Sequence, residues 1–369
     1  MRHIFFSVFL LGLGGGAVLG LYVLIRRALG LFSLKHERLL SLLGSLGILA
    51  LVVALDGLLG VGTLAILFLL LFSLGASLVR WGIHVLFPGK SRRSWRCLYR
   101  LSLIPLLCTA LLLGYGYRNM TNPVCTSYTV TTEKDIPREG YRVALLSDLH
   151  YGSILEADTL QEVCREISQA QVDLVILCGD VVDESTGLSQ LRQVFSILGD
   201  IESRYGIYYV YGNHDRATYT DSPGFTQEEL TGAITENGIR ILRDEAVEIG
   251  TGLVLIGRED RSAPARLYLE QLTEQVDGSR FLLLADHQPR ELAEKARAGI
   301  DLQVSGHTHG GQIFPLGYIS LFLGLNEMNY GLRSIDGMTA IVTSGLAGWG
   351  FPIRTQARSE YVIVEILPR

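Results

Sequence analysis

The sequence predicts an α-helical transmembrane domain followed by an α/β domain. Long uncharged apolar stretches fill the first third of the 369 residues and raise the mean hydropathy of the whole chain to +0.30. The rest of the chain alternates short apolar runs with segments of helical periodicity, which is typical of a layered α/β domain. We expect a membrane domain over residues 1–118, a linker with a first strand over 119–140, and the α/β domain over 141–369.

Charge and cysteine content argue against two classes of protein. The formal net charge is −5, and this near balance of acidic and basic side chains argues against a nucleic-acid partner. The five cysteines form no CxxC pair, so neither a zinc knuckle nor a disulfide framework is expected. The composition gives no basis for inferring a protein partner.

The N-terminal third contains four candidate membrane spans, each without a charged side chain. The first and third are long enough to cross a hydrocarbon core of about 30 Å. The four stretches are Ile4–Ile25, Leu39–Leu55, Gly57–Val79 and Leu101–Tyr117. A cleaved signal peptide is the alternative interpretation of the first, and three spans result if the second or fourth lies in the membrane interface.

Basic residues predict the orientation of these spans. They concentrate in two segments, one between the first and second stretches and one between the third and fourth. These residues are Arg26, Arg27, Lys35 and Arg38, and then Arg80, Lys90, Arg92, Arg93, Arg96 and Arg100. The positive-inside rule places both segments in the cytoplasm. Four spans then put both termini outside it, so we expect a multi-pass protein of the plasma membrane with an extracytoplasmic C-terminal domain.

The C-terminal domain is organised around Leu174–Asp183, which reads LVILCGDVVD. This apolar run is typical of a strand buried on both faces. Gly179 permits a turn there, and Asp180 follows at the carboxyl end of the strand, where α/β sheets present their ligands. A single Gly-Asp after a strand usually forms only a turn or a helix cap.

Four further apolar strands also end in clusters of Asp, Asn or His. The five strands are Tyr141–Ser147, Asp173–Cys178, Ile207–Tyr211, Phe281–Ala285 and Leu302–Ser305. The residues that follow them are Asp148 and His150; Asp180 and Asp183; Asn213, His214 and Asp215; His287; and His307 and His309. Helices are expected over Leu160–Gln171, Ser189–Tyr205 and Thr226–Asn237, and additional strands over Ser127–Thr132, Leu253–Gly257, Thr339–Ser344 and Tyr361–Leu367.

Five such clusters together indicate a metal site. Oxygen and imidazole ligands without thiolates suit Mn, Fe or Zn in a catalytic role better than a structural zinc. The ligands are too many for one ion and fit two. Two divalent ions about 3.5–4 Å apart clamp the attacking and leaving oxygens of a phosphoryl transfer.

These motifs, in this order, resemble the calcineurin-like metallophosphoesterase superfamily over roughly residues 123–369. The glycine-rich segments Gly306–Gln312 and Gly345–Arg354, with the N-terminal spans, are similar to its membrane-attached bacterial branch, the YkuE-type phosphoesterases. The resemblance implies a four-layer α/β/β/α sandwich. It also implies a hydrolase that cleaves phosphate esters by attack of a metal-activated hydroxide.

The resemblance assigns roles to individual residues. Asp148, His150 and His309 would hold one metal, whereas Asn213, His287 and His307 would hold the second. Asp180 would bridge both ions. His214 would contact the substrate phosphate and stabilise or protonate the leaving oxygen, and Asp215 would orient His214. Asp183 would hold a metal-ligating residue in place without contacting the metal itself.

Substrate and membrane contacts are less determined by the sequence. Membrane attachment favours a phosphodiester or pyrophosphate of a lipid-linked or cell-envelope substrate. Two alternatives stay open: an enzyme similar to the UDP-diacylglucosamine pyrophosphatases of lipid A synthesis, and a non-catalytic metal-binding membrane scaffold. Arg354 is a candidate phosphate contact, or else a surface salt bridge. The apolar segment Ile319–Leu325 packs on the core as a buried insertion, dips into the membrane, or lines a groove for a lipid chain.

Overall fold

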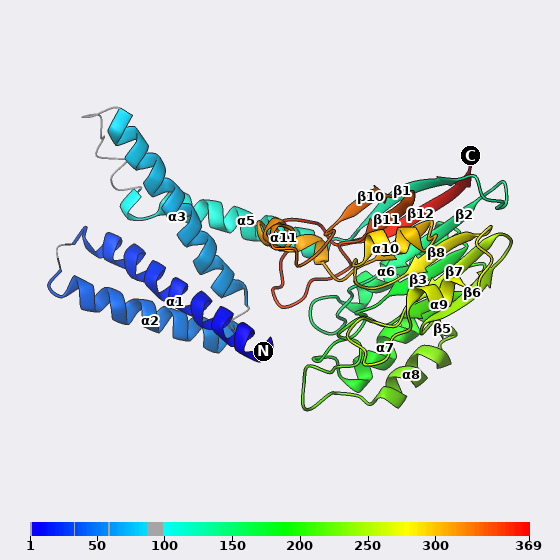
Figure 1. The fold of residues 1–369 in the computed structure, drawn as a ribbon. Helices are drawn as coiled ribbons and strands as arrows, with labels where there is room; N and C mark the ends of the chain where they lie inside the picture. The colour runs from blue at the N-terminus through cyan, green and yellow to red at the C-terminus, as the bar shows by residue number, and fades with distance from the viewer. Residues whose placement is uncertain (1, 33, 58–59, 87–98) are drawn as a thin grey trace. The chain divides into compact units, whose positions relative to one another are not determined.

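The computed structural model describes residues 2–32, 34–57, 60–86 and 99–369. The chain forms two compact units. We call Met1–Tyr117 with Gly350–Ile353 the helical unit, and Arg118–Trp349 with Arg354–Arg369 the sheet unit. Figure 1 shows both, and each is described by itself. The basic residues Lys90, Arg92, Arg93 and Arg96, on which the predicted orientation partly depends, lie outside the described residues.

Helices occupy all four stretches that the sequence marked as candidate spans. They are α1 (Arg2–Leu29), α2 (Glu37–Asp56), α3 (Val61–Leu86) and α5 (Leu103–Thr121). Ala17 and Leu21 of α1 pack with Ile66 of α3 in a small buried cluster. Within the described residues, α2 and α3 are long and apolar enough to cross a membrane. Two candidate spans are therefore shown, and the count of four stays a prediction.

The sheet unit contains two six-stranded sheets. The first has the order β1-β12-β2-β3-β4-β5 and the second the order β10-β11-β9-β8-β7-β6. The strands of the first sheet are β1 (Val124–Thr132), β2 (Tyr141–Leu146), β3 (Leu174–Cys178), β4 (Ile207–Val210), β5 (Ile239–Ile241) and β12 (Glu360–Pro368). Those of the second are β6 (Glu245–Ile249), β7 (Leu253–Gly257), β8 (Phe281–Ala285), β9 (Leu302–Ser305), β10 (Gly331–Ile335) and β11 (Met338–Val342).

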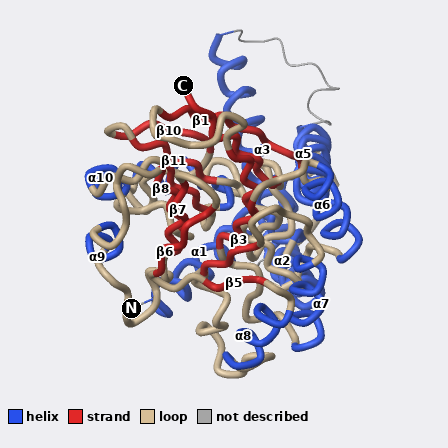
Figure 2. The backbone as a smooth tube through the Cα atoms, turned by 90° about the vertical axis from the view of Figure 1, so that its right-hand side faces the viewer, coloured by secondary structure: helices blue, strands red, loops and turns tan. Residues whose placement is uncertain are grey.

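Helices cover the outer face of each sheet, so the unit has four layers. Figure 2 shows α6 and α7 on one side of the strands and α9 and α10 on the other. The helices are α6 (Ala157–Gln169), α7 (Leu188–Gly199), α8 (Gln227–Glu236), α9 (Leu269–Thr273) and α10 (Leu292–Arg297). This arrangement confirms the predicted α/β domain, which follows apolar N-terminal helices in the chain.

Alternation along the strands produces three apolar cores. In β3, Ile176 lies in the cluster between the two sheets, whereas Val175 and Leu177 pack under α6 and α7. Such alternation follows from the two-residue period of a strand. Leu283 of β8 closes the central cluster from the second sheet. A strand that is buried on both faces must be apolar throughout, which is why β3 was recognisable in the sequence.

Parallel pairing brings the metal-type clusters to one edge. β2, β3 and β4 pair in parallel, and so do β8 and β9 in the other sheet. Their carboxyl ends lead directly into the segments that begin with Ser147, Gly179, Tyr211, Asp286 and Gly306. Carboxyl ends of parallel strands meet at the same edge of a sheet, so side chains distant in sequence converge there.

The predicted elements differ most from the structure at three points. The helix expected over Ser189–Tyr205 ends at Gly199, because the backbone N–H groups of Arg204 and Tyr205 donate to Val172 and Asp173 ahead of β3. β1 starts at Val124, earlier than expected, because it pairs with β12 along its whole length. The short strands β5, β6 and β10 and the helices α9, α10 and α11 (Leu316–Phe322) were not predicted.

Truncating a side chain between the sheets tests this packing. Leu145→Ala removes a fully buried side chain from the central core, so the sheet unit should lose about 2–5 kcal/mol of unfolding free energy. Pulse proteolysis of the full chain in urea measures this loss. Leu267→Ala is the control because Leu267 is exposed, and its effect should stay within about 0.5 kcal/mol. Equal losses in the two variants would contradict the assigned core.

Candidate metal centre

Two groups of side chains with metal-ligand geometry lie at the carboxyl edge of the sheets. Asp148, His150 and His309 form one group, and Asp180, His287 and His307 form the other. In each group the ligand-type atoms lie within 4.8 Å of one another. The sequence singled out all six residues, and the fold brings them together from the ends of four strands, β2, β3, β8 and β9.

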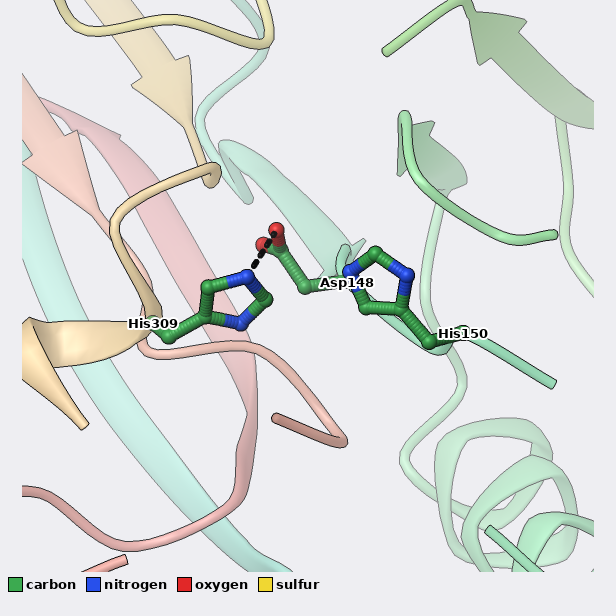
Figure 3. A group of neighbouring side chains, drawn as sticks. All are labelled: Asp148, His150 and His309. Carbon is green, nitrogen blue, oxygen red and sulfur yellow. Dashed lines mark ion pairs between the residues drawn. The ribbon is translucent and has the colours of Figure 1, made fainter. Parts of the chain in front are cut away.

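The first group joins the β2 end to the loop after β9. Figure 3 shows Asp148 between the imidazoles of His150 and His309, with Nε2 of His309 3.8 Å from Oδ1 of Asp148. Nδ1 of His150 lies 3.1 Å from Oδ2 of Asp183, a hydrogen bond that fixes the ring. Nε2 of His150 is then left free to point into the group. A carboxylate behind a ligating imidazole is the usual support of a metal-binding histidine.

The second group is built in the same way. Nδ1 of His287 lies 2.7 Å from the carbonyl oxygen of Cys178 and donates to it. Its Nε2 faces Oδ2 of Asp180 at 3.1 Å. Two lone pairs at that distance repel unless a proton or a cation lies with them. This contact favours a metal ion beside the Asp180–His287 pair.

Asp180 touches both groups. Oδ1 accepts the backbone N–H of His214, and Oδ2 lies 3.9 Å from Nε2 of His150 as well as 3.1 Å from Nε2 of His287. One carboxylate oxygen thus faces a histidine of each group. This position is the one expected of a bridging ligand.

Buried polar atoms without a hydrogen-bond partner, here called orphaned atoms, test whether the expected ligands fit two metal ions. Among the described residues, several buried side-chain atoms have no hydrogen-bond partner, and four of them belong to expected ligands: Nε2 of His150, Oδ2 of Asp180, Oδ1 of Asn213 and Nε2 of His287. Buried polar atoms are almost always paired, since an unpaired one costs about 1–3 kcal/mol. Four unpaired atoms on residues that were expected to be ligands fit a dinuclear metal centre.

The charges of the site also fit cations. Burial raises the pKa of Asp148. Burial alone would raise the pKa of Asp180 too, but the charge and hydrogen bond of His287 hold it well below its ordinary value. Burial lowers the pKa of His307 to about 3, and it lowers the pKa of His309 well below the ordinary value. Both imidazoles are therefore neutral at physiological pH, the form that ligates metals.

The ligands occupy strained backbone. Asp148, His150, Asp180, His307 and His309 all have positive φ, between 41° and 70°. This left-handed region is uncommon for residues other than glycine, and such strain clusters at functional sites. The strand ends are therefore shaped for ligand placement rather than for backbone stability.

Gly306 makes room for the first group. A Cβ at this position would lie 2.0 Å from Oγ of Ser147 and 2.3 Å from Oδ2 of Asp148. The backbone N–H of the next residue, His307, donates to both carboxylate oxygens of Asp148 at 3.0 Å. The absence of a side chain thus allows the β9 loop to bind the β2 ligand directly.

The structure corrects the expected role of Asp215. Its carboxylate accepts backbone N–H groups of Asp180, Val181, Val182 and Gly212 at 2.5–3.2 Å, so it fastens the β3 loop to the β4 loop. It is therefore engaged with backbone and does not orient the His214 ring. Glu184 takes that place, with Oε2 2.9 Å from Nδ1 of His214.

Sequence reasoning missed Glu184 and the aromatic neighbours of His214. The rings of Tyr219 and Trp349 lie 5.1 Å and 5.2 Å from the His214 ring, centroid to centroid. Glu184 directly follows Asp183, so a second carboxylate in that loop was the available signal. Glu184 and the charge of Asp180 outweigh burial and raise the pKa of His214.

The structure does not place Arg354 at the surface, where either a phosphate contact or a surface salt bridge was expected. Its side chain is fully buried, and the guanidinium donates to the backbone carbonyls of His309, Ala347 and Arg358. Burial lowers its pKa to about 10. Arg354 therefore stabilises the loop next to His309, because its guanidinium donates hydrogen bonds to three separate backbone carbonyls there.

The comparisons with known proteins agree with this geometry. The model of the "Calcineurin-like phosphoesterase superfamily domain" matches residues 141–324. An uncharacterized metallophosphoesterase of Helicobacter pylori is 32% identical over 70% of this chain and 69% of its own length. The chain belongs to the calcineurin-like phosphoesterase superfamily. It is thus a metal-dependent phosphoesterase of a family whose members use two metal ions, and the resemblance stated from its motifs is confirmed.

Two other relatives are relevant to the N-terminal helices and to the resemblance to the YkuE-type branch. A "transmembrane protein with metallophosphoesterase domain" of Danio rerio is 30% identical over 71% of this chain and 62% of its own length. The uncharacterized metallophosphoesterase YkuE of Bacillus subtilis is 26% identical over 68% of this phosphoesterase and 88% of its own length.

Removing one ligand should reduce the metal content of this phosphoesterase. Asp180 faces both groups, so Asp180→Ala should lower bound divalent metal from about two ions per chain toward zero, whereas His287→Ala should leave about one. Elemental analysis of the purified full chain measures this. Two ions retained in Asp180→Ala would contradict the bridging position.

Gly306→Ala tests the close approach of the two loops. The added methyl would displace Asp148, so metal content and turnover should both fall at least tenfold. Gly278→Ala is a matched control, because a Cβ there meets nothing within 4 Å. An unchanged metal content in Gly306→Ala would show that the loops can move apart without loss of the ion.

Proposed function

We propose that this protein is a membrane-anchored dinuclear-metal hydrolase that cleaves a phosphodiester or pyrophosphate of a lipid-linked or cell-envelope substrate. The observation that supports it best is the position of Asp180 between two ligand groups, each with an orphaned imidazole nitrogen. In this proposal Asp148, His150 and His309 hold one ion and Asn213, His287 and His307 hold the other. Bound divalent ions supply Lewis-acid activation of water and of the phosphoryl group.

His214 is the proposed proton donor to the leaving oxygen. Its backbone N–H is fixed by Asp180, its Nδ1 by Glu184, and its ring contacts the rings of Tyr219 and Trp349. Because Nδ1 is held by a carboxylate, Nε2 is the nitrogen left to meet the substrate. The raised pKa of His214 keeps a proton available on that nitrogen near neutral pH.

The membrane part supports the choice of substrate class. α2 and α3 are candidate spans, and the Danio rerio relative is named as a transmembrane protein. A catalytic domain that is tied to a bilayer meets phosphate esters of lipids and of the envelope at high local concentration. We place the domain outside the cytoplasm, in a multi-pass chain, because of the basic segments on the opposite side of the predicted spans.

Turnover of matched esters tests the reaction. The full chain in detergent is stripped of metal, given Mn, Fe, Zn or Mg, and assayed with ethyl p-nitrophenyl phosphate beside p-nitrophenyl phosphate. We expect metal-dependent turnover with preference for the diester. A folded chain that binds two ions and hydrolyses neither ester nor any lipid ester would contradict the proposal and favour a metal-binding scaffold.

The leaving group separates the roles of His214 and Glu184. p-Nitrophenolate leaves without a proton, so His214→Ala should cost more with a phenyl ester than with a p-nitrophenyl ester, by about 10²-fold. Glu184→Gln should show the same dependence on the leaving group to a smaller degree, with metal content unchanged. Asp215→Asn is the contrasting variant, since loosening the β3 loop should lower metal content. An equal loss on both esters in His214→Ala would contradict the acid role.

A further inference from the structure

The helix α11 presents its apolar side chains to solvent. Phe322 is 90% exposed, and Tyr318, Ile319 and Leu323 are each more than 40% exposed. The alternative in which this segment packs on the core is therefore wrong. Large apolar side chains gathered on one exposed element of a folded protein indicate an interaction surface. We call Phe314, Leu316, Tyr318, Ile319, Phe322 and Leu323 the apolar ridge.

The ridge is exposed because the polar and small side of the helix is the side that packs inward. Gly317 is buried, its N–H donates to Oε1 of Gln356, and its carbonyl accepts from Nδ2 of Asn329. Oγ of Ser320 also contacts the Asn329 amide. The helix is thus held with its apolar face outward, the reverse of the usual arrangement on a soluble domain.

Charge is absent from the segment that carries the ridge. From Gly310 to Asn326 no residue is Asp, Glu, Lys, Arg or His. A protein–protein interface normally has a polar rim with about one hydrogen bond per 100–200 Å². An uncharged face of aliphatic side chains with tyrosine and phenylalanine fits the bilayer interface, which requires no such partners.

The same loop that holds α11 also holds the end of α5, the apolar helix that leads into the sheet unit. Oγ1 of Thr355 accepts the N–H of Phe314, and Gln356 accepts the N–H of Gly317. A few residues further on, Ser359 donates its N–H to the carbonyl of Asn119 and its hydroxyl to the carbonyl of Met120. Loop 354–359 therefore anchors the ridge beside the point where the chain leaves α5.

The ridge is also connected to the metal centre. η1 (His309–Gly311) begins at the ligand His309 and precedes α11 in the chain, and the hydroxyl of Thr308 donates to the carbonyl of Asn329. Asn329 is the residue that holds Gly317 and Ser320. Few bonds thus separate a metal ligand from the base of the ridge, so the position of one fixes the position of the other.

We propose that the apolar ridge of α11 inserts into the interfacial layer of a lipid bilayer. Insertion to about 5–10 Å, the usual depth of such helices, would bring the metal centre to the level of lipid headgroups. The consequence for substrate choice rests on the proposed function: phosphate esters that are embedded in the same membrane would reach the site without leaving it.

Depth-dependent quenching tests the insertion. The full chain is reconstituted in phosphatidylcholine nanodiscs with an environment-sensitive fluorescent amino acid in place of Phe322. The control carries the same fluorophore in place of Tyr268, which is 78% exposed just before α9. We expect doxyl-labelled phosphatidylcholine to quench position 322 at least threefold more than position 268. Equal quenching, or protection of position 322 from both doxyl lipid and aqueous iodide, would overturn the proposal, the latter by placing protein over the ridge.

A second measurement uses esters that share the same reacting bond. In the variant Phe322→Ser/Leu323→Ser, hydrolysis of soluble ethyl p-nitrophenyl phosphate should stay within about twofold of the parent. Hydrolysis of hexadecyl p-nitrophenyl phosphate in the nanodisc should fall at least tenfold, and Tyr268→Ser should change neither. Equal rates on the lipid ester would overturn the link between ridge and substrate. A parent inactive on both esters would refute the proposed function, while the quenching result would still decide the insertion.

Discussion

A single buried carboxylate, Asp180, is the constraint on which the rest of the sheet unit depends. A negative charge without solvent at the end of a central strand is very costly unless cations or donors surround it. The chain meets this requirement in two ways: His214 donates a backbone N–H to Oδ1, and imidazoles from both sheets face Oδ2. The narrow turns around Gly179 and Gly212 then follow, since a Cβ at Gly212 would lie 2.2 Å from the Asp180 carboxylate.

The two-sheet architecture explains how so many ligands reach one point. Each sheet alone offers only the ends of its own parallel strands, whereas packing face to face brings β3 and β8 to a common edge. Asp215 then ties the loops after β3 and β4 into one body through four backbone N–H groups. Arg354 does the same behind His309. Two buried residues, Asp215 and Arg354, thus position the ligand loops through hydrogen bonds to the backbone.

The features that could be predicted from the sequence are those that a local pattern of residues encodes. β8 and β9 were predicted with their observed bounds, and the six clustered ligands were found because each follows an apolar strand. The four-layer arrangement and the pairing of ligands came from the family resemblance. Glu184, the burial of Arg354 and the true partners of Asp215 were missed because they depend on contacts across loops far apart in sequence. The outward face of α11 was undecided for the same reason, since its inner anchors, Asn329 and Gln356, lie outside the helix.

The left-handed backbone at the ligands has a consequence for how the protein acquires its metals. Those conformations are held by bonds that do not involve the ligating atoms, such as Leu149 and His150 donating to the carbonyl of Asp180. These bonds support the cradle independently of the ligating atoms, unlike small zinc domains that fold only around their metal. A site supported in this way would allow one divalent ion to replace another without refolding, so the supply of metals in the surrounding compartment would decide which ions it holds.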